Sequence, residues 1–155
     1  MRKAFNLIMA IAMIVMLSGA AIMTMKYVSI SATHISDNYL KEQAQIFAKS
    51  VLEAAILKVE GYDRSVNSDC LESFNTSSVD GRFLASVKIK HYYLYNGKDN
   101  DGSSLANCSL VESIETEESH GYVTIEVVVD TNQSHPKIKN YTSPIRVVER
   151  SLQRP

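Results

Sequence analysis

Residues 1–26 read MRKAFNLIMAIAMIVMLSGAAIMTMK, and this opening stretch decides the organisation of the chain. No charged residue occurs over the 22 positions from Ala4 to Met25. A transmembrane helix needs roughly 20 apolar residues, so this run is long enough to cross a bilayer. Arg2 and Lys3 precede the run. Since basic flanking residues stay in the cytoplasm, the rest of the chain is expected on the far side.

Three interpretations of this stretch predict different proteins. A secretory signal peptide has a basic start, a shorter apolar run and a cleavage site between small residues, which Ser18-Gly19-Ala20 would supply before Ala21. A signal anchor would keep the whole stretch. A class III leader would lose only a few basic residues on the cytoplasmic side, and the apolar helix would stay on the mature protein.

The sequence after residue 26 favours a helix that is kept. No Gly or Pro occurs between Gly19 and Gly61, and strong helix formers dominate over residues 38–60. The apolar residues there recur at the spacing of one helix face: Leu40, Ala44, Phe47, Ala48, Val51, Leu52, Ala55, Ile56 and Val59. One continuous helix from near Phe5 to near Glu60 would be about 80 Å long. A discarded signal peptide gives no reason for such continuity.

The layout resembles the superfamily of type IV pilins and type II secretion pseudopilins. The resemblance is carried by KAFNLI at residues 3–8, followed by an unbroken apolar helix that becomes amphipathic and leads into a small β domain. It implies that a prepilin peptidase cuts between Ala4 and Phe5 and methylates the new amine. It also implies four segments: a leader over 1–4, a transmembrane helix half over 5–25, an amphipathic helix half over 26–60 and a β domain over 61–155.

Three features depart from the family pattern. The family usually has Gly before the cut, where this chain has Ala4, and its helix-kinking Pro is absent, since the first Pro is Pro136. The family's acidic residue, four positions after the N-terminal Phe, falls on Met9. In the family this carboxylate pairs with the amine of the neighbouring subunit, which a thioether cannot do. Members without the acid resemble tip-located minor pseudopilins, so the resemblance implies a minor subunit.

The residues after Gly61 predict a β domain. Three runs have the length and composition of strands, and a fourth is weaker: Arg82–Tyr95, Tyr122–Asp130, Ser143–Leu152 and Leu110–Glu115. Alternation in the first run puts Val87, Ile89, His91 and Tyr93 on one face and Lys88, Lys90 and Tyr92 on the other. Turn signals separate the runs at Asn96-Gly97, Asp101-Gly102, His120-Gly121 and the loop 132–140. The predicted fold class is α+β, a long N-terminal helix packed on three or four antiparallel strands, pilin-like.

The cysteines suit an exported domain. Cys70 and Cys108 are the two cysteines of the chain, and in an oxidising compartment such a pair predicts one disulfide. In the chain-entropy model this bond would stabilise a small domain by roughly 3 to 4 kcal/mol. The alternative is two unpaired buried thiols. No metal site is expected, since there is no CxxC or HxxxH spacing and the histidines are scattered at His34, His91, His120 and His135.

Two acidic segments are candidate cation sites. The loop Asn96–Ser103 matches the last part of a calcium-loop pattern at Asp99, Asp101 and Gly102, but it has Gly97 at the first ligand position. A hairpin turn is the better interpretation. The cluster of Glu112, Glu115, Glu117 and Glu118 is interpreted as a solvated charged turn.

Glycosylation sequons occur at Asn75, Asn107, Asn132 and Asn140. Asn132 alone also has an acidic residue two positions earlier, Asp130, which is the extended form that resembles bacterial acceptor sites. Asn132 is therefore the candidate glycosylation site, although we expect it to be unoccupied.

The sequence predicts a structural protein rather than an enzyme. No nucleophile elbow, phosphate-binding loop or carboxylate pair with a nearby base is present. The net charge of −1 and the lack of a basic stripe argue against nucleic-acid binding. No cofactor is expected.

The resemblance implies a minor subunit of a type II secretion or type IV pilus filament. Its partners would be other pilin or pseudopilin subunits, the prepilin peptidase and the assembly platform. Before assembly it would span the bacterial inner membrane once, with a cytoplasmic N-terminus and a periplasmic C-terminal domain. The alternative is a membrane-anchored or signal-peptide-bearing periplasmic binding domain that does not assemble.

Overall fold

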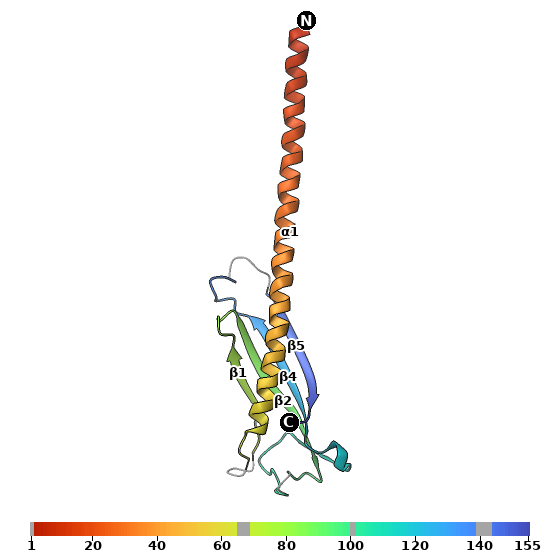
Figure 1. Cartoon of the computed structure of the whole chain (residues 1–155), viewed down its shortest axis with the longest axis vertical. Coiled ribbons are helices and arrows are strands. Elements are labelled where there is room, and N and C mark those ends of the chain that lie inside the picture. Colours follow the sequence, from red (N-terminus) through yellow and green to blue (C-terminus); the bar gives the residue numbers. More distant parts are fainter. Residues whose placement is uncertain (1, 65–68, 100–101, 139–143) are drawn as a thin grey trace. The chain divides into compact units, whose positions relative to one another are not determined.

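A computed structural model describes residues 2–64, 69–99, 102–138 and 144–155, with side chains from Ile8 onward. It confirms the α+β fold class (Figure 1). The elements in chain order are α1 (Arg2–Glu60), β1 (Ser73–Ser77), β2 (Phe83–Tyr95), β3 (Val111–Ile114), the 3-10 turn η1 (Glu117–Ser119), β4 (Tyr122–Thr131) and β5 (Arg146–Gln153).

Helix α1 runs without a break from Arg2 to Glu60, as the lack of Gly and Pro after Gly19 predicts. The helix ends at Glu60, as the sequence predicts from Gly61. The Gly61 backbone N–H still donates to the Leu57 carbonyl at 3.0 Å, and the chain then leaves the helix. The chain forms two compact units, Met1–Tyr39 and Leu40–Pro155. The first unit is helical, and the second contains the last turns of α1 and all the strands.

The sheet has the strand order β1-β2-β4-β5, with antiparallel neighbours throughout, and β3 also pairs with β2. Two features differ from the expectation of three or four antiparallel strands. Strand β1 was not predicted, and β3 pairs with β2 in parallel, Tyr92 opposite Val111. β3 therefore runs in the same direction as β2. Strands β1 and β3 thus share one side of β2, and β4 takes the other.

The predicted facing of β2 is right for its first half and wrong for its second. The register with β4 shifts between Ile89 and His91, which is a β-bulge. Val87 and Ile89 are buried before the bulge, whereas Tyr92 and Leu94 are buried after it. His91 therefore does not continue the inward-facing row, because one extra residue reverses every later side chain.

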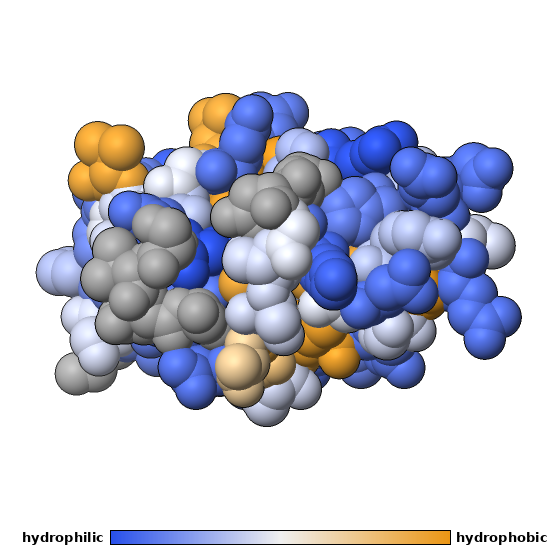
Figure 2. Space-filling view, turned by 90° about the horizontal axis from the view of Figure 1, so that it is seen from below, coloured by the Kyte–Doolittle hydropathy of each residue, from blue (hydrophilic) through white to orange (hydrophobic). Residues whose placement is uncertain are grey.

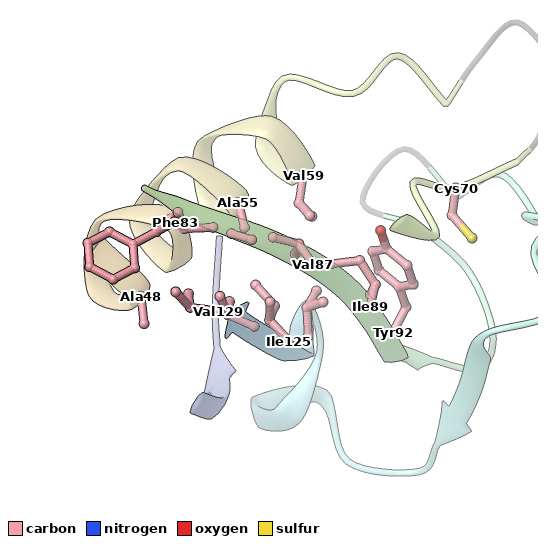
Figure 3. Close-up of a cluster of buried hydrophobic side chains, with 14 of the residues drawn as sticks. Ala48, Ala55, Val59, Cys70, Phe83, Val87, Ile89, Tyr92, Ile125 and Val129 are labelled. Carbon is pink, nitrogen blue, oxygen red and sulfur yellow. The ribbon is translucent and has the colours of Figure 1, made fainter. Parts of the chain in front are cut away.

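The core lies between the last turns of α1 and one face of the sheet (Figures 1 and 3). The predicted helix face is confirmed: Leu40, Ala44, Ala48, Val51, Ala55 and Val59 are buried, and Phe47, Leu52 and Ile56 pack against them partly buried. Alanines at three of these positions let the helix backbone approach the sheet closely. The facing sheet residues are mainly β-branched, including Val87, Ile125 and Val129, which are all fully buried. This packing fixes the second unit as a folded domain.

Candidate functional site

The most distinctive surface of the chain is the apolar part of α1, here the segment Ile8–Met25. Every residue in it is exposed, and large apolar side chains point in all directions: Ile8, Met9, Ile11, Met13, Ile14, Val15, Met16, Leu17, Ile22, Met23 and Met25. A helix that is apolar all round needs a non-aqueous environment, either lipid or other protein. By length and composition α1 is able to cross a membrane, two properties that a signal sequence near an N-terminus shares.

Polar side chains in this part of α1 are satisfied by the helix itself. The hydroxyls of Ser18 and Thr24, and that of Thr33 just beyond the apolar segment, each donate to the backbone carbonyl three residues earlier, at 2.8–2.9 Å. In lipid an unpaired hydroxyl is costly, and a bond to a carbonyl of the same helix removes that cost. These residues therefore fit a membrane or a packed helix bundle.

The predicted processing residues Ala4 and Phe5 lie in the first turns of α1, and their side chains are outside the described residues. Met9 lies in α1, is 54% exposed and carries an uncharged thioether. The first acidic residue of the chain is Asp37, far along the same helix. The first 36 residues of the sequence therefore contain no carboxylate side chain.

The predicted disulfide is confirmed. Cys70 and Cys108 are bonded, with their Cα atoms 5.3 Å apart, and both residues are buried. The bond ties the segment that follows α1 to the loop that follows β2. Beside it, the Tyr92 hydroxyl donates to the Leu71 carbonyl at 2.8 Å, and burial raises the pKa of Tyr92 to about 12. The two links hold a region with little regular structure against the sheet.

The loop Asn96–Ser103 begins as a turn, with φ of 51° at Asn96 and 69° at Gly97. Residue 101, part of the calcium-like pattern, is outside the described residues. Both oxygens of Asp99 accept hydrogen bonds from Nη1 of Arg64 at 3.0 Å, and Nη2 of Arg64 donates to the Val59 carbonyl at 3.3 Å. The Asp99 carboxylate therefore joins this loop to the end of α1.

A cavity of about 290 Å³ adjoins this ion pair. Its lining includes Arg64, Tyr92, Asp99, His120 and Arg154. Nδ1 of His120 accepts the backbone N–H of residue 95 at 2.9 Å, so the proton of the neutral ring is on Nε2. Arg64, Asp99, Tyr92 and His120 on the cavity wall thus hold loops in place through their hydrogen bonds.

The outward face of the sheet carries an ionic group that sequence reasoning missed. Glu126 of β4 accepts from Nε of Arg150 at 2.6 Å and from Nζ of Lys90 at 3.2 Å. The hydrogen bond from Arg150, followed by that from Lys90, holds the pKa of Glu126 below its usual value. The sequence indicates this ionic group only through Glu126, a single acidic residue between two β-branched residues at an outward position of a strand. The group links the three longest strands.

The remaining candidates are dispersed. Among the described residues, no group of three or more His, Cys, Asp or Glu side chains is placed to hold a metal ion. Within the acidic cluster, Glu112 pairs with Nδ1 of His91 at 3.0 Å. Glu115, Glu117 and Glu118 are exposed. The cluster therefore lies at the surface, as a solvated turn does.

Asn132, the candidate glycosylation site, is engaged in a turn. Its Nδ2 donates to the Gly81 carbonyl at 2.9 Å, and its Oδ1 accepts the backbone N–H of Ser134 at 3.1 Å. A glycan would attach at that same Nδ2. The sequon at Asn140 lies outside the described residues.

The surface of the domain contrasts with the apolar segment. The end seen in Figure 2 is mostly hydrophilic, with apolar residues in scattered patches. The chain thus combines a water-compatible domain with a helix segment that requires burial. A comparison with protein-family models, curated proteins and solved structures finds no match to this chain.

Proposed function

We propose that this chain is a structural, pilin-like minor subunit of a type II secretion or type IV pilus filament. One observation carries the proposal: the apolar segment continues as the same unbroken helix into the turns that pack on the sheet. A membrane anchor joined by a linker would not need this continuity. A subunit whose helix leaves the membrane and packs beside other helices would need it.

The exposure of α1 beyond residue 20 supports retention of the helix. If a signal peptidase cut before Ala21, the mature chain would still expose Tyr27, Val28, Ile30 and Ile35 on a helix, each at least 58% exposed. Soluble monomers rarely expose contiguous apolar patches of this kind, which commonly mark an interaction surface. The segment therefore suits burial against other subunits once it is outside the lipid.

In the proposed mechanism the apolar segment moves from lipid into contact with other helices. In the membrane the apolar segment is buried in lipid, and on assembly it exchanges lipid contacts for helix–helix contacts of similar apolarity. Removal of residues 1–4 deletes Arg2 and Lys3, which takes the formal charge of the side chains from −1 to −3. Loss of these two charges frees the helix from its cytoplasmic anchor.

The minor role rests on Met9. A neighbour's N-terminal amine buried beside Met9 would have no carboxylate to neutralise it, and an unpaired buried charge is costly. This favours few copies at the end of a filament over many in its shaft. The proposal places the domain in the periplasm, where the disulfide forms, with the prepilin peptidase and the assembly platform as partners.

The N-terminus of the mature protein tests the proposal. Protein purified from membranes is expected to begin at Phe5 and to keep its apolar segment. A start at Ala21 would mean a signal peptide and a released domain, and an intact Met1 would mean a simple anchor; either would overturn the proposal. Ala4→Trp should block the cut and leave the precursor in the membrane. The matched control Ile8→Leu changes an apolar residue of the same helix and should leave the cut intact.

A further inference from the structure

Strand β5 forms one edge of the sheet (Figure 1). Its eight residues pair with β4 in an unbroken register that begins with Arg146 opposite Asp130. Beyond this ladder, no backbone group of Arg146–Gln153 forms a hydrogen bond to the described residues. An edge strand of this length, without a Pro or a bulge, presents a row of unpaired N–H and C=O groups to which a further strand can be added.

The outward face of this edge alternates basic and apolar side chains. The exposed residues along β5 are, in order, Arg146, Val148, Arg150 and Leu152. Nε of Arg150 lies 2.6 Å from Glu126, and Nε of Arg146 lies 3.7 Å from Asp130. The Nη atoms of both arginines form no hydrogen bond to the described residues, and the two side chains are 73% and 68% exposed. Each guanidinium group thus has a carboxylate of β4 on one side and keeps donors for a second carboxylate.

A second copy of the chain is a poor occupant of this edge. When two copies of β5 pair antiparallel about a twofold axis, the residues opposite each other lie on the same face of the sheet. The two registers with the largest overlap then place Glu149 opposite Glu149, or Arg150 opposite Arg150. Like charges directly opposite each other are destabilising. The edge therefore suits a strand of different sequence better than it suits itself.

We propose that β5 is the docking edge for an extended segment of a partner protein, in which acidic and apolar residues alternate along the outward face. Antiparallel addition would set the acidic residues opposite Arg146 and Arg150 and the apolar residues opposite the two positions between and after them. Main-chain hydrogen bonds would supply the affinity, and the outward side chains of β5 would select the sequence. The docking edge belongs to the sheet of the domain and does not depend on how the N-terminus is processed. It takes a single partner strand, which agrees with a subunit present in few copies.

A synthetic peptide tests this edge. Its residues alternate threonine with, by turns, valine and glutamate, and a control peptide has lysine in place of glutamate. Amide hydrogen exchange of the full chain in a non-ionic detergent is measured with each peptide at millimolar concentration, because a strand that becomes ordered on binding binds weakly. The glutamate peptide is expected to slow exchange in β5 and to leave the other edge strand, β1, unchanged. The lysine peptide should protect neither strand.

Arg146→Gln shows whether charge selects the strand. The ion pair of Arg146 with Asp130 is exposed to solvent, so its loss should leave the fold stable. The variant should weaken binding of the glutamate peptide about threefold to fivefold. Lys88→Gln is the matched control, because it removes the same charge from an exposed position of β2, away from the edge, and should have no effect. The Tm of both variants is measured to establish that they fold.

Four results would overturn the docking edge. The first two are no protection of β5 by the glutamate peptide and equal protection by the lysine peptide. The third is binding that Arg146→Gln leaves unchanged, since charge would then not select the strand. The fourth is protection of β5 in a dimer that forms without peptide, which would make a second copy the occupant. None of these results bears on where the mature N-terminus begins, so the proposed processing stands or fails separately.

Discussion

Removal of the disulfide should destabilise the domain by an amount that the loop length sets. Cys70 and Cys108 enclose 38 residues, and the chain-entropy relation for a loop of that size gives about 4 kcal/mol. For a domain of little over a hundred residues this corresponds to a fall in Tm of about 15 °C. Both cysteines are buried, so a Cys70→Ala, Cys108→Ala double variant introduces no buried hydroxyl.

The assay is thermal unfolding of the full chain in detergent, followed by the circular dichroism of the sheet with and without a reductant. Reduction of the wild type should reproduce the loss seen in the double variant, and the reductant should not change the Tm of the variant. A fall of less than about 4 °C in both experiments would refute the reasoning, because it would mean that the loop is restrained equally well by its other contacts.

Three further predictions concern the folded domain. Ile125→Ala removes a fully buried side chain and should cost about 2–5 kcal/mol in denaturant unfolding, whereas exposed Leu152→Ala should change the unfolding free energy by less than about 0.5 kcal/mol. Because the folded pKa of Glu126 is lowered, its contribution to stability is present above the usual glutamate pKa of 4.5 and is lost as pH falls through the folded value. Glu126→Gln should therefore flatten the fall in Tm below that pH, and an unchanged profile would contradict the role of this carboxylate. Asn132→Ala should lower stability by about 1 kcal/mol through the lost bond of Nδ2, and the intact mass of native protein should equal the bare chain; added mass lost in this variant would show a glycan.

The helix and the principal strands could be predicted from the sequence because their signals are local. The absence of Gly and Pro and the repeat of apolar residues are both visible within short windows, and α1, β2, β4 and β5 follow them. Strand β1 could not be found this way, because SFNTS has a single large apolar residue and forms by pairing with β2. The bulge in β2 was also invisible, since one extra residue leaves the composition of the run unchanged and alters only its register with β4.

The features of the candidate site also divide into those that local sequence determines and those that depend on tertiary contacts. The apolar segment could be predicted in full, since composition alone defines it. The ion pair of Arg64 and Asp99 joins residues 35 positions apart, and Glu126 meets Arg150 across two strands, so both depend on tertiary register. The cysteine pairing was predictable because two cysteines allow a single intramolecular bond.

The buried disulfide has a consequence for the order of events during biogenesis. A ribosome or an export channel delivers a chain N-terminus first, so Cys70 and Cys108 both emerge before β4, which begins at Tyr122. In the finished domain their side chains are 6% and 7% exposed, too little for an oxidising enzyme to reach. Enzymatic oxidation is therefore expected before the domain has finished folding, while the two thiols are still accessible. A thiol oxidase acts best between the appearance of Cys108 and the completion of the fold, and a chain that folds before oxidation carries two buried thiols.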